Sequence, residues 1–183
     1  VLLEAQGADG ELDQQRFKMA LESAFEQGLL VDAAVSQSES DCHAFWQIRD
    51  DVQQIFQLGT PLFFDVSLPI DRMSAYVDDV RSSLTTTEAL AVYVFGHLGD
   101  GNLHFGIPLP DDRAAALRPQ IEACVYGPLA EFKGSVSAEH GIGLEKKPWL
   151  SVSRSPEEIA LMKTLKRALD PHNMLNPGKI FDV

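Results

Sequence analysis

An α+β fold, with a mixed or antiparallel sheet and helices packed mainly on one face, is the fold class that this sequence predicts. Short apolar runs alternate with amphipathic stretches along the chain. One connection is rich in turn-forming residues, as in a hairpin between antiparallel strands. The 183 residues contain no internal repeat, low-complexity tract or long linker, so we expect a single domain over residues 1–183.

The N-terminal third is expected to contain two strands and two helices. Residues 1–4 and 33–37 are short apolar runs of strand type. Residues 13–27 carry apolar side chains at helical spacing, and a second helix is expected to begin at Asp41, a residue type that caps helix N-termini. Because the chain opens in strand-like sequence without an initiator Met or a leader, we expect it to be a domain excised from a longer protein.

The remaining elements complete the α+β pattern. A strand is expected over residues 62–68, and two more should flank the Gly-rich segment 96–106. Helices are expected after Asp71 and after Asp111 or Asp112. The last helix has the clearest start, because a cap, an N1 proline and the acid of a capping box follow one another. These residues are Ser155, Pro156 and Glu158, and the helix should stop at Asp170, before a proline.

Composition disfavours several classes of protein. Hydrophobic residues make up 45% and charged residues 23%, as in a globular fold, and no apolar run approaches the roughly 18 residues of a membrane span. A net charge of −12 disfavours binding to nucleic acid, which needs a Lys/Arg-rich surface. The two cysteines, Cys42 and Cys124, fit a reducing compartment better than a disulfide framework, so we expect a cytoplasmic protein.

The segment from Gly96 to His104 predicts a hairpin that carries two histidines. Residues 99–102 are all turn-forming, which places His97 and His104 symmetrically about the loop. Directly opposed residues on one face have Cβ atoms roughly 4.5–5.5 Å apart, close enough for two imidazoles to share a divalent cation. The alternative is an ordinary hairpin with two polar surface histidines.

A second cluster, residues 135–143, places Glu139 and His140 among small residues. The Glu139 carboxylate would complete a His/His/Glu set with open coordination positions, as in catalytic metal sites. His140 would serve as a general base, since the ordinary pKa of histidine, near 6.5, suits proton abstraction at neutral pH. The alternative is a solvated Glu-His pair at the end of a strand.

The two motifs together resemble the C-terminal domain of FAD-linked oxidases, a family that includes D-lactate, glycolate and D-2-hydroxyglutarate dehydrogenases. The motifs are Gly-His-Leu-Gly-Asp-Gly-Asn-Leu-His and Ser-Ala-Glu-His-Gly-Ile-Gly. Residues 45–49, 65–69 and 175–181 support the resemblance, which covers nearly the whole chain in order.

This resemblance implies a ferredoxin-like substrate domain that works with a separate N-terminal domain, absent from this chain, in which FAD is bound. A divalent metal, zinc or manganese, would be held by His97, His104 and Glu139 and would chelate a small 2-hydroxyacid. His140 would take the hydroxyl proton while the hydride leaves for the flavin. The enzyme would be an FAD-dependent 2-hydroxyacid dehydrogenase, and this fragment would be inactive alone.

The resemblance also implies two groups of binding residues. Arg49 would clamp the substrate carboxylate, a task that suits its planar fork, or else form a surface ion pair with Asp50 or Asp51. Asn176, Gly178 and Lys179 would pass near the flavin, or else form a chain-terminating turn. The stretch 146–149 is expected to be a solvated loop.

Two departures from the family pattern bear on the substrate. The hydroxyglutarate branch carries a lysine just before the Asp-x-Ser-Leu-Pro strand, where this chain has the apolar residues 62–64. It also tends to carry an asparagine two residues after the second hairpin histidine, where this chain has Gly106. A less polar pocket would fit lactate, glycolate or a longer aliphatic 2-hydroxyacid, and hydroxyglutarate is put in doubt.

Two other functions remain open from the residues alone. One is a self-contained metallohydrolase that activates water on a His/His/Glu metal. The other is a non-catalytic binding module with a structural metal or none. A homodimer is compatible with the sequence, and so is a peripheral position at the inner membrane through an electron acceptor.

Overall fold

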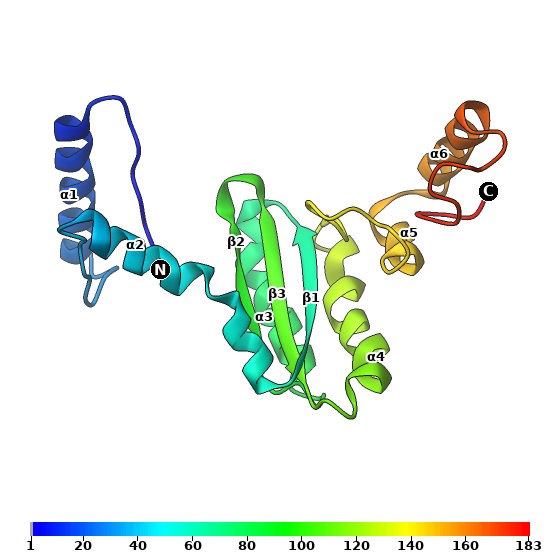
Figure 1. Cartoon of the computed structure of the whole chain (residues 1–183), viewed down its shortest axis with the longest axis horizontal. Coiled ribbons are helices and arrows are strands. Elements are labelled where there is room, and N and C mark those ends of the chain that lie inside the picture. The colour runs from blue at the N-terminus through cyan, green and yellow to red at the C-terminus, as the bar shows by residue number, and fades with distance from the viewer. Residues whose placement is uncertain (1) are drawn as a thin grey trace. The chain divides into compact units, whose positions relative to one another are not determined.

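The computed structural model describes residues 2–183, which form two compact units that divide between Gln53 and Gln54 (Figure 1). The first unit contains α1 (Gly10–Glu26) and α2 (Glu39–Asp50). Asp9 caps α1 by accepting a hydrogen bond from Leu12 N at 3.1 Å. Ser38 caps α2 in the same way, through Asp41 N at 3.1 Å.

Three predictions for this first unit are wrong. Residues 2–4 and 33–37 are not strands, and Val1 lies outside the described residues. A strand needs a neighbour that completes its backbone hydrogen bonds, and neither segment is paired in a sheet within the described part of this unit. Asp41 lies inside the first turn of α2 and is not its N-cap, because Ser38 occupies that position; the Asp41 carboxylate accepts from Gln37 N at 3.0 Å.

The second unit is an antiparallel sheet with helices on one face (Figure 1). Its strands are β1 (Thr60–Ser67), β2 (Tyr93–His97) and β3 (Asn102–Leu109), in the order β1-β3-β2. The helices α3 (Met73–Leu84) and α4 (Ala114–Tyr126) follow β1 and β3 in the chain. This β-α-β-β-α succession is the ferredoxin-like arrangement without its last strand, so the predicted α+β class is confirmed.

The remaining helices complete the chain. They are the 3₁₀ helices η1 (Val52–Leu58), η2 (Ile70–Arg72), η3 (Leu98–Asp100), η4 (Gly127–Ala130) and η5 (Lys147–Trp149), and the helices α5 (Leu150–Ser153) and α6 (Pro156–Leu169). The predicted capping box is confirmed, since Ser155 Oγ accepts from Glu158 N and Glu158 Oε2 accepts from Ser155 N. None of the helices in residues 2–183 is long and apolar enough to cross a membrane.

Helix starts at Asp71 and Asp111 are displaced by a few residues. Asp71 lies in η2, and α3 begins only at Met73. Asp111 instead accepts a hydrogen bond from Thr60 Oγ1 at 2.7 Å, and α4 begins at Ala114 with no side-chain cap. Each carboxylate therefore lies in the turn before its helix.

Alternation along the strands separates a core face from an open face. Alternate side chains of β1 and β3, such as Phe64, Val66, Phe105 and Ile107, are buried against α3 and α4. Tyr76 of α3 belongs to the same core, and its hydroxyl donates to Val125 O of α4 at 2.6 Å. The intervening strand residues lie on the opposite face, where the predicted hairpin histidines are found.

Candidate metal centre

The hairpin has a different register from the one that symmetry about residues 99–102 predicts. His97 pairs with Asn102, and His104 pairs with Phe95, so the two histidines are diagonal neighbours and are not directly opposed. The reason is the turn. Leu98–Asp100 forms η3, Gly101 takes a left-handed φ of 75°, and Asn102 already belongs to β3. Asp100 is a turn residue as expected, because its carboxylate accepts from Asn102 N at 3.1 Å.

This difference leaves both histidines on the same face of the sheet. The predicted and observed pairings differ by two residues, and a shift by an even number of residues keeps every side chain on its face. The centroids of the His97 and His104 rings lie 5.7 Å apart, with an interplanar angle of 86°. The hairpin alone therefore supplies two imidazoles to one patch of the open face.

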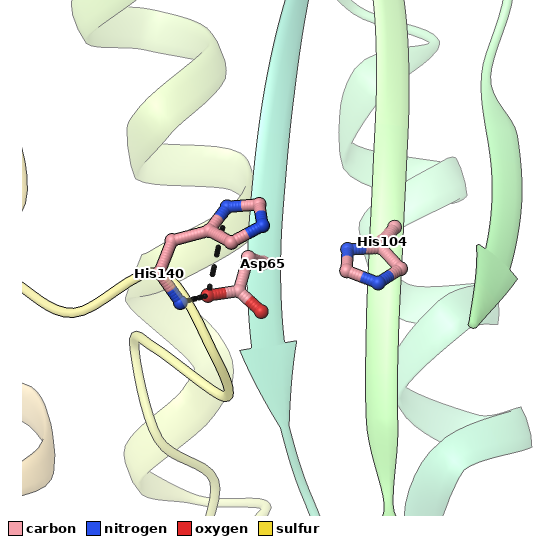
Figure 2. Close-up of side chains that lie close together, drawn as sticks. All are labelled: Asp65, His104 and His140. Carbon is pink, nitrogen blue, oxygen red and sulfur yellow. Dashed lines mark hydrogen bonds and ion pairs between the residues drawn. The ribbon is translucent and has the colours of Figure 1, made fainter. Parts of the chain in front are cut away.

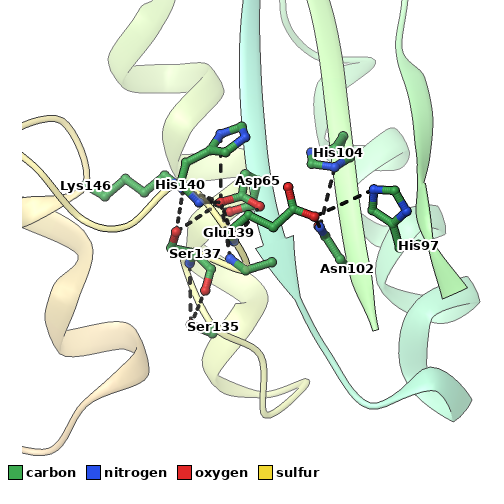
Figure 3. A network of polar contacts seen from close by, with 10 residues as sticks. Asp65, His97, Asn102, His104, Ser135, Ser137, Glu139, His140 and Lys146 are labelled. Carbon is green, nitrogen blue, oxygen red and sulfur yellow. Dashed lines mark hydrogen bonds and ion pairs between the residues drawn. The ribbon is translucent and has the colours of Figure 1, made fainter. Parts of the chain in front are cut away.

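Glu139 reaches this patch from the loop that follows α4 and η4 (Figure 3). Its Oε1 lies 3.6 Å from His97 Nε2 and accepts a hydrogen bond from Asn102 Nδ2 at 2.6 Å. The nearest ligand atoms of His97, His104 and Glu139 all lie within 4.8 Å of one another. The three residues predicted as metal ligands, which we call the triad, thus come together. Asn102, predicted only as a turn residue, holds the Glu139 carboxylate beside the two histidines.

The electrostatics of His104 favour the form that binds metals. Partial burial lowers the pKa of His104 below its ordinary value of 6.5, although the negative charges of Asp65 and Glu139 oppose the shift. The imidazole is therefore neutral at pH 7, with a ring nitrogen lone pair free to coordinate. His97 and Glu139 are about half exposed, at 47% and 46% of their side-chain surface, so they can adjust around an ion.

His140 lies near His104 on the same side of the sheet (Figure 2). Its ring stacks against that of His104, with centroids 5.8 Å apart and an interplanar angle of 28°. Its Nδ1 lies 3.9 Å from Asp65 Oδ2, and the side chain is 63% exposed. The predicted base is thus next to the predicted ligands and open to an incoming molecule.

Asp65 was not predicted as a site residue, although the motif that it opens was recognised. It projects from β1 onto the open face opposite His104 and is only 1% exposed. Burial alone would raise its pKa, but hydrogen bonds from the backbone N–H groups of His140 and Glu139, together with the Lys146 ammonium, hold the pKa of Asp65 well below its ordinary value. It is therefore ionised throughout the neutral range.

The expectation of a solvated loop at residues 146–149 is wrong for Lys146, which is only 9% exposed. Its ammonium donates to Asp65 O at 3.0 Å, to Asp65 Oδ2 at 3.1 Å and to Ser137 Oγ at 3.1 Å. Burial lowers the pKa of Lys146, although its hydrogen bond to Asp65 opposes the shift. No local pattern marks Lys146 as buried, because its partner Asp65 lies 81 residues earlier in the chain.

The other predicted residues lie outside this cluster. Arg49 belongs to the first unit, where its Nη1 contacts Asp50 Oδ1 at 2.8 Å and its guanidinium lies over the Trp46 ring at 5.6 Å. The segment 176–179 forms a turn, in which Lys179 N donates to Asn176 O at 3.2 Å and Gly178 has a φ of 71°. These local contacts correspond to the alternatives of a surface ion pair and a chain-terminating turn, and they leave the binding roles untested.

Aromatic side chains lie beside the triad on the open face. Phe63, Tyr93 and Phe95 are 45%, 41% and 40% exposed, and the Phe95 ring contacts that of His104 with centroids 5.3 Å apart. Gly106 pairs with both Phe63 and Tyr93, at the middle of this aromatic surface. The open face is thus polar at the triad and apolar beside it.

Comparison with known proteins gives the family. Residues 1–180 match the family described as FAD linked oxidases, C-terminal domain. The chain is 39% identical over 180 residues to a D-2-hydroxyglutarate dehydrogenase of Xanthomonas citri pv. viticola, covering 96% of this chain and 38% of the relative. It is 36% identical over 183 residues to the mitochondrial D-2-hydroxyglutarate dehydrogenase of Arabidopsis thaliana, covering 98% of this chain and 32% of the relative.

A third relative carries a different substrate in its name. The chain is 35% identical over 192 aligned residues to a putative mitochondrial D-lactate dehydrogenase of Schizosaccharomyces pombe, covering 98% of this chain and 36% of the relative. The chain thus spans about a third of the length of the curated relatives it matches. Nearly all of it lies within one family match. The chain therefore belongs to the family of the C-terminal domains of FAD-linked oxidases.

Proposed function

We propose that this chain is the substrate- and metal-binding half of an FAD-dependent dehydrogenase that oxidises a D-2-hydroxyacid to the 2-oxoacid. The observation that carries the proposal is the convergence of His97, His104 and Glu139 on one patch of the open face, with His140 beside them. The family supplies the flavin chemistry, and a separate FAD-binding domain of the same polypeptide is the partner that the proposal requires.

The donor set suits a divalent metal such as zinc or manganese. A tetrahedral ion with bonds of about 2.0–2.1 Å holds its ligand atoms about 3.3 Å apart, and the triad atoms already lie within 4.8 Å. Two imidazoles and one carboxylate would leave coordination positions open for a substrate hydroxyl and carboxylate. A metal held by His97, His104 and Glu139 would lower the pKa of the substrate hydroxyl, and the flavin would supply the hydride acceptor.

His140 is the residue that we assign as general base. Its Nδ1 faces the Asp65 carboxylate at 3.9 Å, which leaves Nε2 as the atom that takes the hydroxyl proton. The ring is largely exposed and lies against His104, so a hydroxyl bound at the triad comes within its reach. Arg49 is retained as the proposed clamp for the substrate carboxylate, and Asn176, Gly178 and Lys179 as the proposed flavin contacts.

The aromatic surface beside the triad favours a substrate with an apolar tail over one with a second carboxylate. Phe63, Tyr93 and Phe95 are exposed there, and none of them offers a positive charge. Lactate and longer aliphatic 2-hydroxyacids fit this surface, whereas two of the three relatives above are named for D-2-hydroxyglutarate. We therefore propose, in addition, a preference for apolar 2-hydroxyacids.

Anaerobic bleaching of the flavin tests the whole proposal. The complete flavoprotein is mixed with D-lactate, D-2-hydroxyisocaproate, D-2-hydroxyglutarate and their L-enantiomers, and its visible spectrum is recorded. We expect bleaching by the apolar D-acids, lost in His140→Ala and after treatment with a chelator. His43→Ala, which changes an exposed histidine of α2, should bleach like the wild type.

Two results would overturn the proposal. One is a flavin that no 2-hydroxyacid bleaches. The other is zinc-dependent hydrolysis of model esters by the 183-residue chain alone, which would support a metallohydrolase. Calorimetric titration of the chain with Mn²⁺ tests the metal separately, and Glu139→Gln should abolish the heat of binding.

A further inference from the structure

Asp65 is a buried carboxylate that accepts hydrogen bonds from one loop and one lysine (Figure 3). Five donors surround it: the backbone N–H groups of Ala138, Glu139 and His140, the Ser137 hydroxyl and the Lys146 ammonium. Four of these donors reach Oδ2 alone, and the Glu139 N–H is shared between Oδ2 and Oδ1, so Oδ2 is fully engaged by the loop and the lysine. Asp65, His104 and His140 form a second group of potential ligands, in which Oδ1 is the Asp65 oxygen with capacity left.

The three backbone donors are consecutive, and this fixes the path of the loop. The N–H groups of Ala138, Glu139 and His140 lie 3.2, 3.1 and 2.8 Å from the Asp65 oxygens. With the backbone held in this way, the Glu139 side chain runs toward Asn102 and His97, and the His140 ring runs to His104. Gly141, with a φ of 76°, turns the chain away afterwards.

Lys146 compensates for the free-energy cost of burying the charge of Asp65. An isolated carboxylate in the interior loses its hydration, and a partner cation with complete hydrogen bonding compensates for that loss. The three protons of the ammonium meet three acceptors, two on Asp65 and one on Ser137. Because Ser137 also donates to Asp65 Oδ2 at 3.0 Å, the loop, the strand and the lysine form one closed network.

We propose that Asp65, with Lys146 as its counter-ion, is a positioning residue that places both Glu139 and His140. It acts through the backbone of residues 138–140 and lies outside the proposed ligand set of His97, His104 and Glu139. The consequence for metal binding rests on the function proposed above, whereas the ordering of the loop does not. One buried charge thus sets the position of a metal ligand and of the base together.

The test uses Asp65→Asn in the 183-residue chain and measures two quantities. Amide hydrogen exchange at residues 138–140 should become at least about tenfold faster, because the amide group cannot accept all three N–H groups, while β3 stays protected. Affinity for Mn²⁺, measured by calorimetry, should fall by about 10- to 100-fold, as for other residues that orient metal ligands.

Asp170→Asn is the matched control. Asp170 is also a mostly buried carboxylate that pairs with a lysine, Lys166, and accepts backbone hydrogen bonds from Met174 and Leu175, at 2.9 and 2.8 Å. It contacts none of the triad residues, so Mn²⁺ affinity should remain that of the wild type. If Asp65→Asn does not fold, Ser137→Ala removes only one donor and should give the same changes in smaller measure.

The outcomes separate this inference from the proposed function. If the wild type binds Mn²⁺, and Asp65→Asn binds it equally with residues 138–140 still protected, the positioning role is wrong and the proposed function stands. If the wild type binds no Mn²⁺, the proposed metal site fails. Exchange at residues 138–140 then still decides: faster exchange in Asp65→Asn supports the positioning role, and unchanged exchange overturns it.

Discussion

Asn102 Nδ2 donates a 2.6 Å hydrogen bond to Glu139 Oε1, joining residues that lie 37 positions apart in the chain. Asn102 is almost fully buried, whereas the Glu139 side chain is about half exposed, so the fixed partner orients the mobile one. The same amide nitrogen lies 3.5 Å from His104 Nε2. One side chain thus contacts two of the three proposed metal ligands, and its removal provides the first prediction.

Asn102→Ala should lower the affinity of the chain for Mn²⁺ by about tenfold or more, since the loss of a group that orients metal ligands has that effect. Titration calorimetry measures the change. Tyr76→Phe is the control, because it removes a buried hydrogen bond of the opposite face, from Tyr76 to Val125 O, and should cost about 1 kcal/mol of stability without altering metal affinity. Equal affinity in Asn102→Ala and the wild type would contradict the prediction.

Gly101→Ala should destabilise the second unit by about 2 kcal/mol. Gly101 has a φ of 75°, and an added Cβ would lie 2.3 Å from the backbone oxygen of Leu68. Urea unfolding followed by circular dichroism measures the loss. Gly99→Ala, two residues earlier in the same turn, meets no atom within 4 Å and should unfold like the wild type. Similar midpoints for both variants would rule out the strain argument.

Acid should destabilise the second unit through Asp65 and Asp170. The Lys166 ammonium and the N–H groups of Leu175 and Met174 lower the pKa of Asp170 to about 2, and the pKa of Asp65 is also lowered. Because the folded form binds these protons less readily than the unfolded form, the stabilisation is complete above the unfolded value near 3.8 and is lost as the pH falls through the folded value.

Urea midpoints at several pH values between about 7 and 2.5 measure this dependence, with most of the loss below about pH 4. Asp170→Asn should lose less stability over that pH range, because one of the two groups no longer titrates. The exposed Asp112→Asn serves as the comparison and should follow the wild type. A wild-type midpoint that does not change down to about pH 2.5 would refute the linkage.

Phe63→Lys should shift substrate preference toward a dicarboxylate. Phe63 is 45% exposed beside Gly106 on the open face, so a lysine there would present its charge near the triad. A partly exposed charge pair contributes about 0.5–1 kcal/mol, which corresponds to a two- to fivefold rise in kcat/KM for D-2-hydroxyglutarate relative to D-lactate. Steady-state kinetics of the complete flavoprotein measure the ratio, and Leu161→Lys on α6 controls for added charge.

Local patterns in the sequence were sufficient for the hairpin and for the identity of the candidate ligands. His97 and His104 flank a turn, and a register error of two residues did not move them off their face. The capping box of α6 is equally local and was confirmed. Residues 2–4 and 33–37 do not form the expected strands, because strand formation depends on a partner that an apolar run does not specify.

The residues that hold the site together could not be read from local patterns. Asp65 occupies a strand position whose side chain would face solvent if the sheet were considered alone. It is buried because a loop from 70 to 75 residues later covers it, attached to the edge of β1 by the Ser67–Ser135 bridge. Lys146 gave no signal of its own, and Asn102 resembled a turn residue because its neighbours were turn residues.

The alternation of side chains along β1, β2 and β3 has a consequence for how such a domain can diverge. Core-face residues such as Phe64 and Phe105 are constrained by packing against helices, whereas their immediate neighbours Phe63 and Gly106 lie on the other face. A change at the half-exposed Phe63 can therefore alter what lies beside the triad without removing any side chain from the hydrophobic core, whereas a Cβ at Gly106 would lie 2.8 Å from Ile55 Cδ1. Successive positions of one strand are therefore subject to different constraints. Substitutions on the open face can change the surroundings of the substrate while the core face keeps its packing.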